Sequence, residues 1–345
     1  MTEQDLALCE RLIAAYARAA VDARDAGGMW SHEIYRDRQR ELIQALERGD
    51  PAAVAELLGS MFRSDFILGM APGSLGVGRQ PRMLARLSYL ATMSKLVSLA
   101  ESQGTTLVEN PEQGAVGVGL TDGVDDLMES LEGSLGLSID FPAVGAAYGV
   151  LAAGRMITPD TPEQVYAAAR IRDVLQEHFS DRAAPLRIVE IGAGYGGMAY
   201  WLMRLFHEPL QYVVIDLPIA NVLQGYFLAQ TVGHSQVSLY GEGSGSVAVF
   251  PGHALSAVEA PFDVLLNKDS MPEIPRDALL AYLRWALGAC TGIFYSYNQE
   301  AGAEFDGTAQ NVVPRVLTEI GGFERRRRDP SWLRRGYVEE VYAIG

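Results

Sequence analysis

The sequence predicts an α/β fold in which a mostly parallel sheet is closed by two antiparallel strands and preceded by a helical region. Strand and helix patterns alternate from about Leu186 onward, whereas the first 180 residues show helical spacing almost throughout. The last two strand candidates are separated only by a short polar turn. Alternation of this kind produces parallel strands with helices on both faces. We therefore expect a helical domain over residues 1–180 and a sheet domain over residues 181–345.

The helical region contains several segments with an apolar face. Residues 6–21 are rich in alanine, and residues 34–46 continue at helical spacing. A longer apolar stripe over residues 83–99 recurs mostly at steps of three and four, which predicts an amphipathic helix packed into the core. Residues 161–164 form a capping-box pattern with proline at the first helical position, and we expect the helix to run to about Phe179. Such a domain either covers a ligand cleft or forms a dimer.

The sheet region divides into short strands and the helices between them. Strand candidates lie at residues 188–191, 212–216, 237–240, 262–266 and 293–297, and helices are expected at 197–206, 219–231 and 276–287. The closing pair is expected at residues 322–327 and 337–344, on either side of Asp329-Pro330. The arginines at 325–328 would alternate between the two faces of such a strand, so we expect a solvated edge.

Composition limits the kinds of partner. The 345 residues carry a net charge of −15, which argues against binding a phosphate backbone, so no nucleic acid partner is expected. The chain has no apolar run of about 18 residues and no signal-peptide character at its start, so we expect a cytoplasmic protein without a membrane partner. Cys9 and Cys290 are too few and too far apart for a disulfide framework or zinc site. Lysine occurs only at Lys95 and Lys268, which we interpret as a compositional feature. The expected assembly is a homo-oligomer, most simply a dimer.

The most specific motif is the run Glu190-Ile191-Gly192-Ala193-Gly194-Tyr195-Gly196-Gly197, which follows an apolar strand. The glycines at 192, 194 and 196 lack a Cβ, so a ligand could approach the backbone closely. The helix expected after them presents its free N–H groups toward the same place. The motif therefore predicts a site for a nucleotide-like cofactor, with Tyr195 among the contacting residues. A glycine-rich turn without a ligand is the alternative.

The acid before the glycines indicates which cofactor is expected. Gly192, Gly194 and Gly197 also match the G-x-G-x-x-G pattern of dinucleotide-binding folds. A carboxylate at Glu190 would repel a pyrophosphate but attract the ammonium and sulfonium groups of S-adenosylmethionine. We therefore expect S-adenosylmethionine in preference to NAD.

The second strand ends at Asp216, about twenty residues past the glycines. Acids at this place hold ribose hydroxyls in folds of this kind. We expect Asp216 and the adjacent Leu217 to contact the cofactor, and Pro218 suits the first turn of the next helix. A plain helix cap is the alternative role for Asp216, and it does not exclude the first.

Chemistry is expected beyond the carboxyl ends of the strands, and the segment after the fourth strand is unusually polar. It reads Asn267-Lys268-Asp269-Ser270-Met271-Pro272-Glu273. We expect Asn267 to contact the cofactor or the acceptor, and Asp269 and Glu273 to be candidates for receiving the acceptor's proton. The alternative is that Glu273 and Asp277 only place negative charge at the start of the next helix.

Other candidates lie on the same rim. His253 and, less strongly, His234 are the remaining candidate bases, and Asn298 and Glu300 after the fifth strand are expected to contact the substrate. No pair of histidines has metal-ligand spacing. Asp269 and Glu273 could hold Mg²⁺ together with substrate hydroxyls, but two carboxylates are weak support, so no metal site is predicted.

These segments together resemble the bacterial sugar O-methyltransferase family. The similarity lies in residues 109–114, 190–197, 216–218 and 267–273, with further agreement at 298–300 and 339–342, and it extends from about Leu107 to the end. The resemblance implies a Rossmann-like class I methyltransferase that transfers a methyl group from S-adenosylmethionine, often in making glycosylated natural products or surface sugars. A C-methyltransferase, an NAD-dependent oxidoreductase and a cofactor-binding regulatory protein stay open as alternatives.

Overall fold

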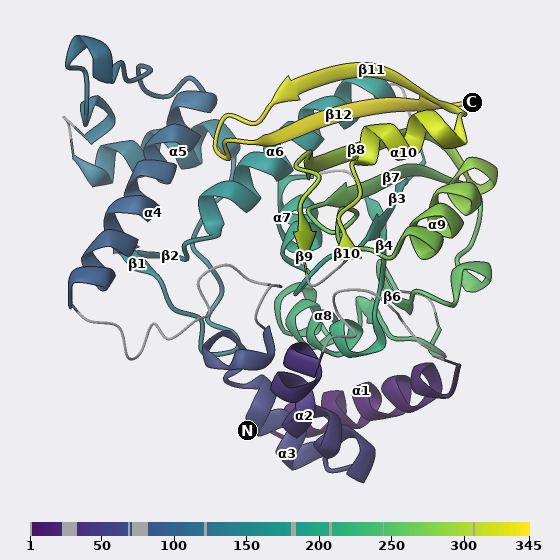
Figure 1. Ribbon diagram of the computed structural model, residues 1–345. Coiled ribbons are helices and arrows are strands. Elements are labelled where there is room, and N and C mark those ends of the chain that lie inside the picture. Colours follow the sequence, from purple (N-terminus) through teal and green to yellow (C-terminus); the bar gives the residue numbers. More distant parts are fainter. Residues whose placement is uncertain are drawn as a thin grey trace.

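The computed structural model describes residues 2–22, 33–67, 70, 82–120, 123–180, 184–206, 209–243, 245–305 and 308–345. Within these residues the main feature is an eight-stranded sheet in the order β11-β12-β8-β7-β3-β4-β6-β5, with helices around it (Figure 1). Two separate two-stranded sheets, β1-β2 and β9-β10, lie outside it.

The large sheet is parallel except at one end. Its parallel strands are β3 (Leu186–Ile191), β4 (Leu210–Asp216), β5 (Val237–Ser238), β6 (Val247–Pro251), β7 (Phe262–Lys268) and β8 (Cys290–Gln299). Strand β12 (Tyr337–Ile344) pairs antiparallel with β8, and β11 (Phe323–Pro330) pairs antiparallel with β12. The predicted fold class and its antiparallel ending are therefore confirmed.

The helices and short elements complete the chain. The helices are α1 (Glu3–Asp22), α2 (Glu33–Arg48), α3 (Pro51–Leu58), α4 (Arg82–Ser102), α5 (Val124–Leu135), α6 (Thr161–Phe179), α7 (Gly197–Leu205), α8 (Pro218–Val232), α9 (Arg276–Ala289) and α10 (Val313–Ile320). The short strands are β1 (Val150–Ala152), β2 (Arg155–Ile157), β9 (Glu304–Phe305) and β10 (Thr308–Ala309). Single turns of 3₁₀ helix lie at Met61–Arg63, Asp65–Ile67, Pro111–Gln113, Val118–Leu120 and Leu255–Ala257.

One strand of the large sheet was not predicted from the sequence. Strand β6 lies beside β4, whereas the expected strand at 237–240 is reduced to the two residues of β5 at the margin. The β6 side chains alternate between buried and half-buried, with Val247 and Val249 pointing inward. A glycine- and serine-rich stretch precedes this short strand and Pro251 ends it, so its flanks look like those of a loop.

The alternating side chains of the central strands divide the molecule into two cores. Ile188 and Val264 face the side that α6, α7 and α8 cover, whereas Val189 and Leu265 face α9 and α10. Buried side chains of α1, α4 and α5 belong to the first of these cores. The helices of residues 1–180 thus share a core with the sheet, and the division into two domains stays a prediction.

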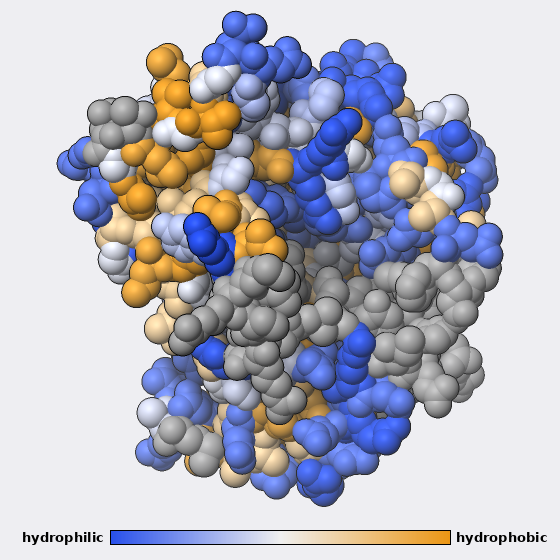
Figure 2. Space-filling view, turned by 60° about the vertical axis from the view of Figure 1, so that its left-hand side comes forward, coloured by the Kyte–Doolittle hydropathy of each residue, from blue (hydrophilic) through white to orange (hydrophobic). Residues whose placement is uncertain are grey.

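The apolar stripe expected on α4 is only partly covered. Met93 and Leu96 are buried as predicted, but Leu87 is 54% exposed and Leu90 is 51% exposed. Figure 2 shows apolar side chains gathered on the side of the molecule that carries α4 and α5. The prediction of core packing is therefore right for the second half of the stripe and wrong at Leu87 and Leu90.

Candidate functional site

The glycine loop leaves the carboxyl end of β3 and enters α7. The backbone φ angle is +73° at Gly192, +60° at Gly194 and +94° at Gly196, a region that residues with a side chain rarely adopt. The Gly192 N–H donates to the carbonyl of Ile215 at 2.8 Å, which ties the loop to the end of β4. The loop conformation therefore requires glycine at each of these three positions.

Close packing within the protein also favours glycine in this loop, at Gly192, Gly194 and Gly197. A Cβ on Gly192 would lie 2.0 Å from the Oγ of Ser270, and one on Gly194 would lie 2.9 Å from the carbonyl oxygen of Met70. A Cβ on Gly197 would lie 2.5 Å from the hydroxyl of Tyr195. Other parts of the protein therefore occupy the space that a side chain at these positions would need. The predicted contacts of the loop with a cofactor stay predictions.

Asp216 is turned toward the glycine loop. Its Oδ1 accepts the Leu217 N–H at 2.8 Å and its Oδ2 accepts Nε2 of Gln224 at 2.7 Å. Burial raises the pKa of Asp216 to about 6, although hydrogen bonds from Leu217, from Gln224 and from the N–H groups of Ala193 and Gly194 oppose the rise. The N-cap of α8 is Leu217, and no side chain caps this helix. The helix-cap alternative for Asp216 is therefore wrong.

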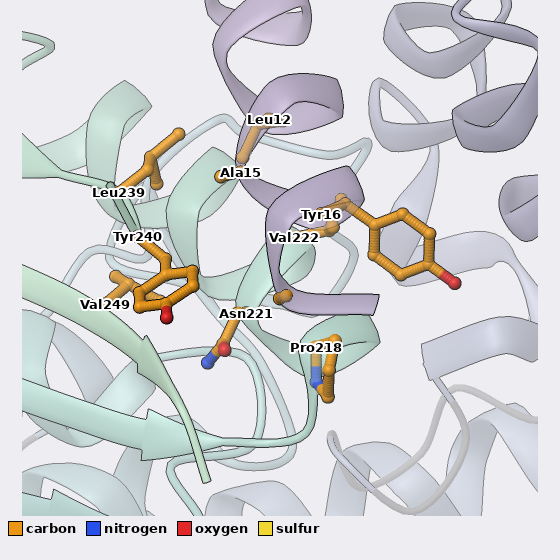
Figure 3. Close-up of a pocket in the computed structure, with 10 residues that line it drawn as sticks. Leu12, Ala15, Tyr16, Pro218, Asn221, Val222, Leu239, Tyr240 and Val249 are labelled. Atoms are coloured by element: carbon orange, nitrogen blue, oxygen red, sulfur yellow. The ribbon is translucent and has the colours of Figure 1, made fainter. Parts of the chain in front are cut away.

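Gln224 is a site residue that the sequence did not reveal. It is fully buried on α8, and its Nε2 also donates to the carbonyl of Gly194 at 3.0 Å. Its Oε1 accepts Nδ2 of Asn221 at 2.9 Å. Asn221 lines a small crevice between α1 and α8 (Figure 3). An amide on the otherwise apolar buried face of α8 is the signal that could have identified Gln224.

Glu190 lies wholly inside the sheet. Its Oε2 accepts the hydroxyl of Tyr212 at 2.8 Å, across the β3–β4 pair. Burial raises the pKa of Glu190 to about 8, and the tyrosine hydrogen bond only partly opposes this rise. The carboxyl group is thus mainly protonated at neutral pH in the free protein, and its expected contact with the cofactor stays a prediction.

Two of the predicted polar residues meet at the ends of β7 and β8. Asn267 is fully buried, and its Nδ2 donates to the carbonyl of Ile191 at 2.7 Å and to Oγ of Ser270 at 2.6 Å. Its Oδ1 accepts Nδ2 of Asn298 at 2.9 Å. This network joins the ends of three neighbouring strands. Asn267 holds the backbone where the glycine loop begins, and Asn298 holds the side chain of Asn267.

Asp269 follows β7 directly and is held by two cations. Its Oδ2 lies 3.0 Å from Nζ of Lys268 and 2.5 Å from Nη1 of Arg334. Burial favours a higher pKa for Asp269, but the charges of Lys268 and Arg334 outweigh burial and lower its pKa. The carboxylate is therefore ionised at neutral pH, and it is a weaker proton acceptor than an unpaired aspartate.

The same cations converge on Glu163, a buried residue in the first turn of α6. Its Oε1 lies 3.2 Å from Nζ of Lys268 and 3.0 Å from Nη1 of Arg334, and its Oε2 lies 3.5 Å from Nζ of Lys95. Both lysines of the chain therefore contact one glutamate. The rarity of lysine was a signal of this cluster, although the sequence alone did not connect the two positions.

The two histidine candidates lie apart from this cluster in the fold. His253 is exposed in the loop after β6, and its ring meets Tyr240 edge to face with 6.2 Å between centroids. His234 lies just before β5, and its backbone carbonyl accepts a hydrogen bond from Arg11 at 3.2 Å. The assignment of His253 as a base stays a prediction.

The remaining acids lie after β7 and β8. The backbone N–H of Glu273 donates to the carbonyl of Ser270 at 3.0 Å, so Glu273 lies in the turn before α9. Glu300 forms a two-pronged ion pair with Arg328 of the edge strand β11, at 2.6 and 2.7 Å. This hydrogen bonding to Arg328 lowers the pKa of Glu300. Glu300, which was predicted to contact the substrate, is thus already paired with Arg328 in the free chain.

Three further findings concern metals, thiols and membranes. In the part of the chain that the structure describes, no three His, Cys, Asp or Glu side chains are grouped so as to hold a metal ion. Cys9 and Cys290 are both buried free thiols. None of the described helices combines the length and apolar character needed to cross a membrane.

Comparisons with known proteins yield structural matches only. No family model and no curated protein matches the chain significantly. An O-methyltransferase family protein from Burkholderia thailandensis is 12% identical, with a TM-score of 0.39, over 54% of this chain and 60% of that one, which is under two thirds of its length. The 1,6-didemethyltoxoflavin-N1-methyltransferase of Burkholderia thailandensis is 18% identical, with a TM-score of 0.36, over 52% of this chain and 78% of that one.

A third match is magnesium protoporphyrin IX methyltransferase from Synechocystis, 13% identical, with a TM-score of 0.36, over 53% of this chain and 82% of that one. Identities and TM-scores this low carry no argument about activity. The functional assignment must therefore come from this chain's own residues.

Proposed function

We propose that the chain is an S-adenosylmethionine-dependent methyltransferase whose acceptor is a hydroxyl group of a sugar or another small natural-product scaffold. The observation that carries the proposal is the position of Asp216. Its carboxylate lies at the end of β4 and against the glycine loop that follows β3. The antiparallel β12 beside β8 is typical of class I methyltransferases rather than of NAD domains. The family resemblance over residues 267–273 supports the hydroxyl acceptor.

The residues at this edge suit the proposed cofactor chemically. Asp216 would accept the ribose hydroxyls, and charge-assisted hydrogen bonds of this kind are each worth about 1.5–3 kcal/mol. The ionised carboxylate of Asp216 beside the loop would repel a pyrophosphate. Glu190, which is mainly protonated in the free protein, would attract a cationic ligand only once it is ionised. Leu217, Asn267 and the glycine loop with Tyr195 would complete the contacts.

When bound, the cofactor supplies a methyl group that is already activated by a sulfonium. The chain has to hold the acceptor in line with that methyl group, and such positioning can contribute about 7–11 kcal/mol. Asn298 and Glu300 are the proposed acceptor contacts. A base that takes the hydroxyl proton adds about 10²–10⁴-fold. Asp269 is the first candidate by position, with Glu273 and His253 as the alternatives.

The helices before the sheet fit a covering role. Helix α6 carries Glu163 to Lys268 and Arg334 at the carboxyl edge of the sheet, so this region contributes charged side chains to the proposed site. We propose that residues 1–180 cover the cofactor edge and contribute to a homodimer. Leu87 and Leu90 on α4 are apolar and exposed, so replacing them with charged residues and measuring the oligomeric state would test the dimer.

The proposal is tested by titration calorimetry followed by turnover. The purified chain should bind S-adenosylmethionine and S-adenosylhomocysteine and give no binding heat with NAD. Binding of NAD alone would overturn the assignment. Transfer of a ¹³C-labelled methyl group to a panel of sugars and glycosylated scaffolds, with nuclear magnetic resonance spectroscopy of the product, would then distinguish O-methylation from C-methylation. Cofactor binding without transfer to any acceptor would favour a regulatory role.

A further inference from the structure

Two buried polar side chains, those of Asp160 and Gln164, lie where α6 begins and contact the glycine loop through Tyr195. Asp160, the N-cap residue of α6, is 3% exposed, and Gln164 in the next turn is 9% exposed. Oδ2 of Asp160 accepts Nε2 of Gln164 at 3.0 Å and the hydroxyl of Tyr195 at 3.3 Å. Since Tyr195 belongs to the glycine loop, this group adjoins the proposed cofactor site.

Two oxygens of this group have no hydrogen-bond donor. Among the described residues, Oδ1 of Asp160 and Oε1 of Gln164 are buried side-chain acceptors without a partner. Residues four apart on a helix lie on one face, so the two oxygens belong to the same side of α6. Buried acceptors are rarely left without a donor, and such cases call for an explanation.

Helix capping does not explain them. The capping box predicted at residues 161–164 is wrong, because the N-cap is Asp160 and its side chain makes no capping hydrogen bond. Oγ1 of Thr161 instead accepts the N–H of Thr158 at 3.1 Å. The Asp160 carboxylate is therefore directed away from the free N–H groups of its own helix and toward the glycine loop.

The protein's own cations do not supply the missing donor. Burial raises the pKa of Asp160, and the charge of Lys268 only partly opposes this rise. Nζ of Lys268 is paired with Glu163 and Asp269 instead. Arg334 is likewise engaged by Glu163 and Asp269. Both oxygens can only accept when Asp160 is ionised, so the matching ligand must donate at least twice and carry positive charge. A primary ammonium group, with three N–H donors, meets both requirements.

We propose that Asp160 and Gln164 bind the α-ammonium group at the amino-acid end of the cofactor. The inference rests on the proposed function, because it takes the ligand of the adjoining glycine loop to be S-adenosylmethionine. Oδ1 of Asp160 accepts one N–H and Oε1 of Gln164 accepts another, while Tyr195 couples the loop to the carboxylate. The ligand thereby satisfies the two acceptors that the free protein leaves unpaired.

Calorimetry with two ligands tests the proposal. S-adenosylhomocysteine carries the amino-acid end, whereas 5′-methylthioadenosine shares the adenosine part and lacks that end. Asp160→Asn removes the charge but keeps the shape, and Gln164→Leu removes the acceptor. Each variant should weaken S-adenosylhomocysteine binding by at least about tenfold, because each removes a hydrogen bond to a charged group. Binding of 5′-methylthioadenosine should stay within about twofold of wild type.

The matched control is Glu339→Gln, which makes the same kind of change in a buried carboxylate. Glu339 is partnered by Tyr166, Tyr295 and Arg170, so the control should leave the ratio of the two affinities unchanged. Unchanged S-adenosylhomocysteine affinity in both variants, or equal weakening of both ligands, would overturn the inference. Failure of the wild-type protein to bind either ligand would instead reject the proposed function.

Discussion

Burial raises the pKa of two carboxyl groups beside the glycine loop, Glu190 and Asp216, but to different extents. Glu190 has one hydrogen-bond donor, Tyr212, and its pKa rises to about 8. Asp216 has several donors, and its pKa rises only to about 6. At neutral pH Glu190 is mainly neutral and Asp216 is mainly ionised, so only Asp216 offers a charged carboxylate that can accept hydrogen bonds from hydroxyl groups.

The raised pKa of Glu190 predicts a pH-dependent stability of the free protein. The folded pKa of about 8 exceeds the ordinary value of 4.5, so its stabilising contribution is complete below about pH 4.5 and is lost as the pH rises toward 8. Glu190→Gln removes this loss. Measured by urea unfolding, the free energy of the variant minus that of wild type should grow by up to about 1.4 kcal/mol per pH unit in this window. A constant difference across these pH values would contradict the prediction.

Asp216 predicts the pH dependence of cofactor binding. Because the ionised carboxylate is the form that accepts ribose hydroxyls, the affinity for S-adenosylhomocysteine should fall as the pH drops below about 6. Asp216→Ala should weaken binding at neutral pH by at least about tenfold. Calorimetry over a pH series measures both effects. A loss under about twofold would show that Asp216 does not hold the cofactor.

Asp269 tests the proposed proton acceptor. Asp269→Asn keeps the shape of the side chain but removes its negative charge, so S-adenosylhomocysteine binding should survive while turnover falls by about 10²-fold or more. The substitution also removes one ion-pair partner of Lys268 and Arg334, which could disturb the fold. Retained S-adenosylhomocysteine binding is therefore the control that the variant is folded. If Asp269→Asn and Glu273→Gln both retain near-full turnover, the segment is architectural and His253 becomes the candidate.

At the scale of elements, regular patterns were predictable and irregular ones were not. The strand ending at Ile191, the glycine loop and the strand ending at Asp216 each follow from a local signal that tertiary structure does not change. Strand β6 was missed because it is short and has loop-like flanks. The start of α6 was misassigned because residues 161–164 match a capping box by residue type, whereas the N-cap is Asp160. The side chain of Asp160 makes no capping hydrogen bond and instead accepts the hydroxyl of Tyr195, a tertiary contact that no local pattern contains.

Helix α8 connects to the site through Gln224, which we predict to be a positioning residue. Its Nε2 holds the carbonyl of Gly194 and the carboxylate of Asp216, and it lowers the pKa of Asp216. Gln224→Leu should weaken cofactor binding and move the midpoint of the affinity–pH profile above about 6, since Asp216 loses a donor. Gln230→Leu is the matched control, because Gln230 lies on the same helix but bonds to Asp5. Equal pH midpoints in the two variants would reject the role.

At the scale of the whole molecule, the site depends on contacts that no local pattern contains. Glu163, Lys268 and Arg334 come from α6, β7 and the turn between β11 and β12, and they meet in one ion-pair cluster. The orphaned oxygens of Asp160 and Gln164 likewise become visible only once α6 is packed on the glycine loop. The sequence could therefore predict the edge of the sheet that we propose as the cofactor site, but not the residues that the helical region contributes to it.

This packing predicts that the chain folds as one cooperative unit, although the sequence indicates two domains. A fragment of residues 181–345 would lack α6, and the first-core side chains Ile188, Val264 and Tyr295 would lose helical cover. The fragment would also leave Glu339 without Tyr166 and Arg170. We expect it to bind a hydrophobic dye and to show no cooperative urea transition, whereas the full chain should unfold in a single transition by fluorescence and circular dichroism. A cooperative transition in the isolated fragment, with native-like near-ultraviolet circular dichroism, would show instead that the boundary near residue 180 separates two independently folding domains.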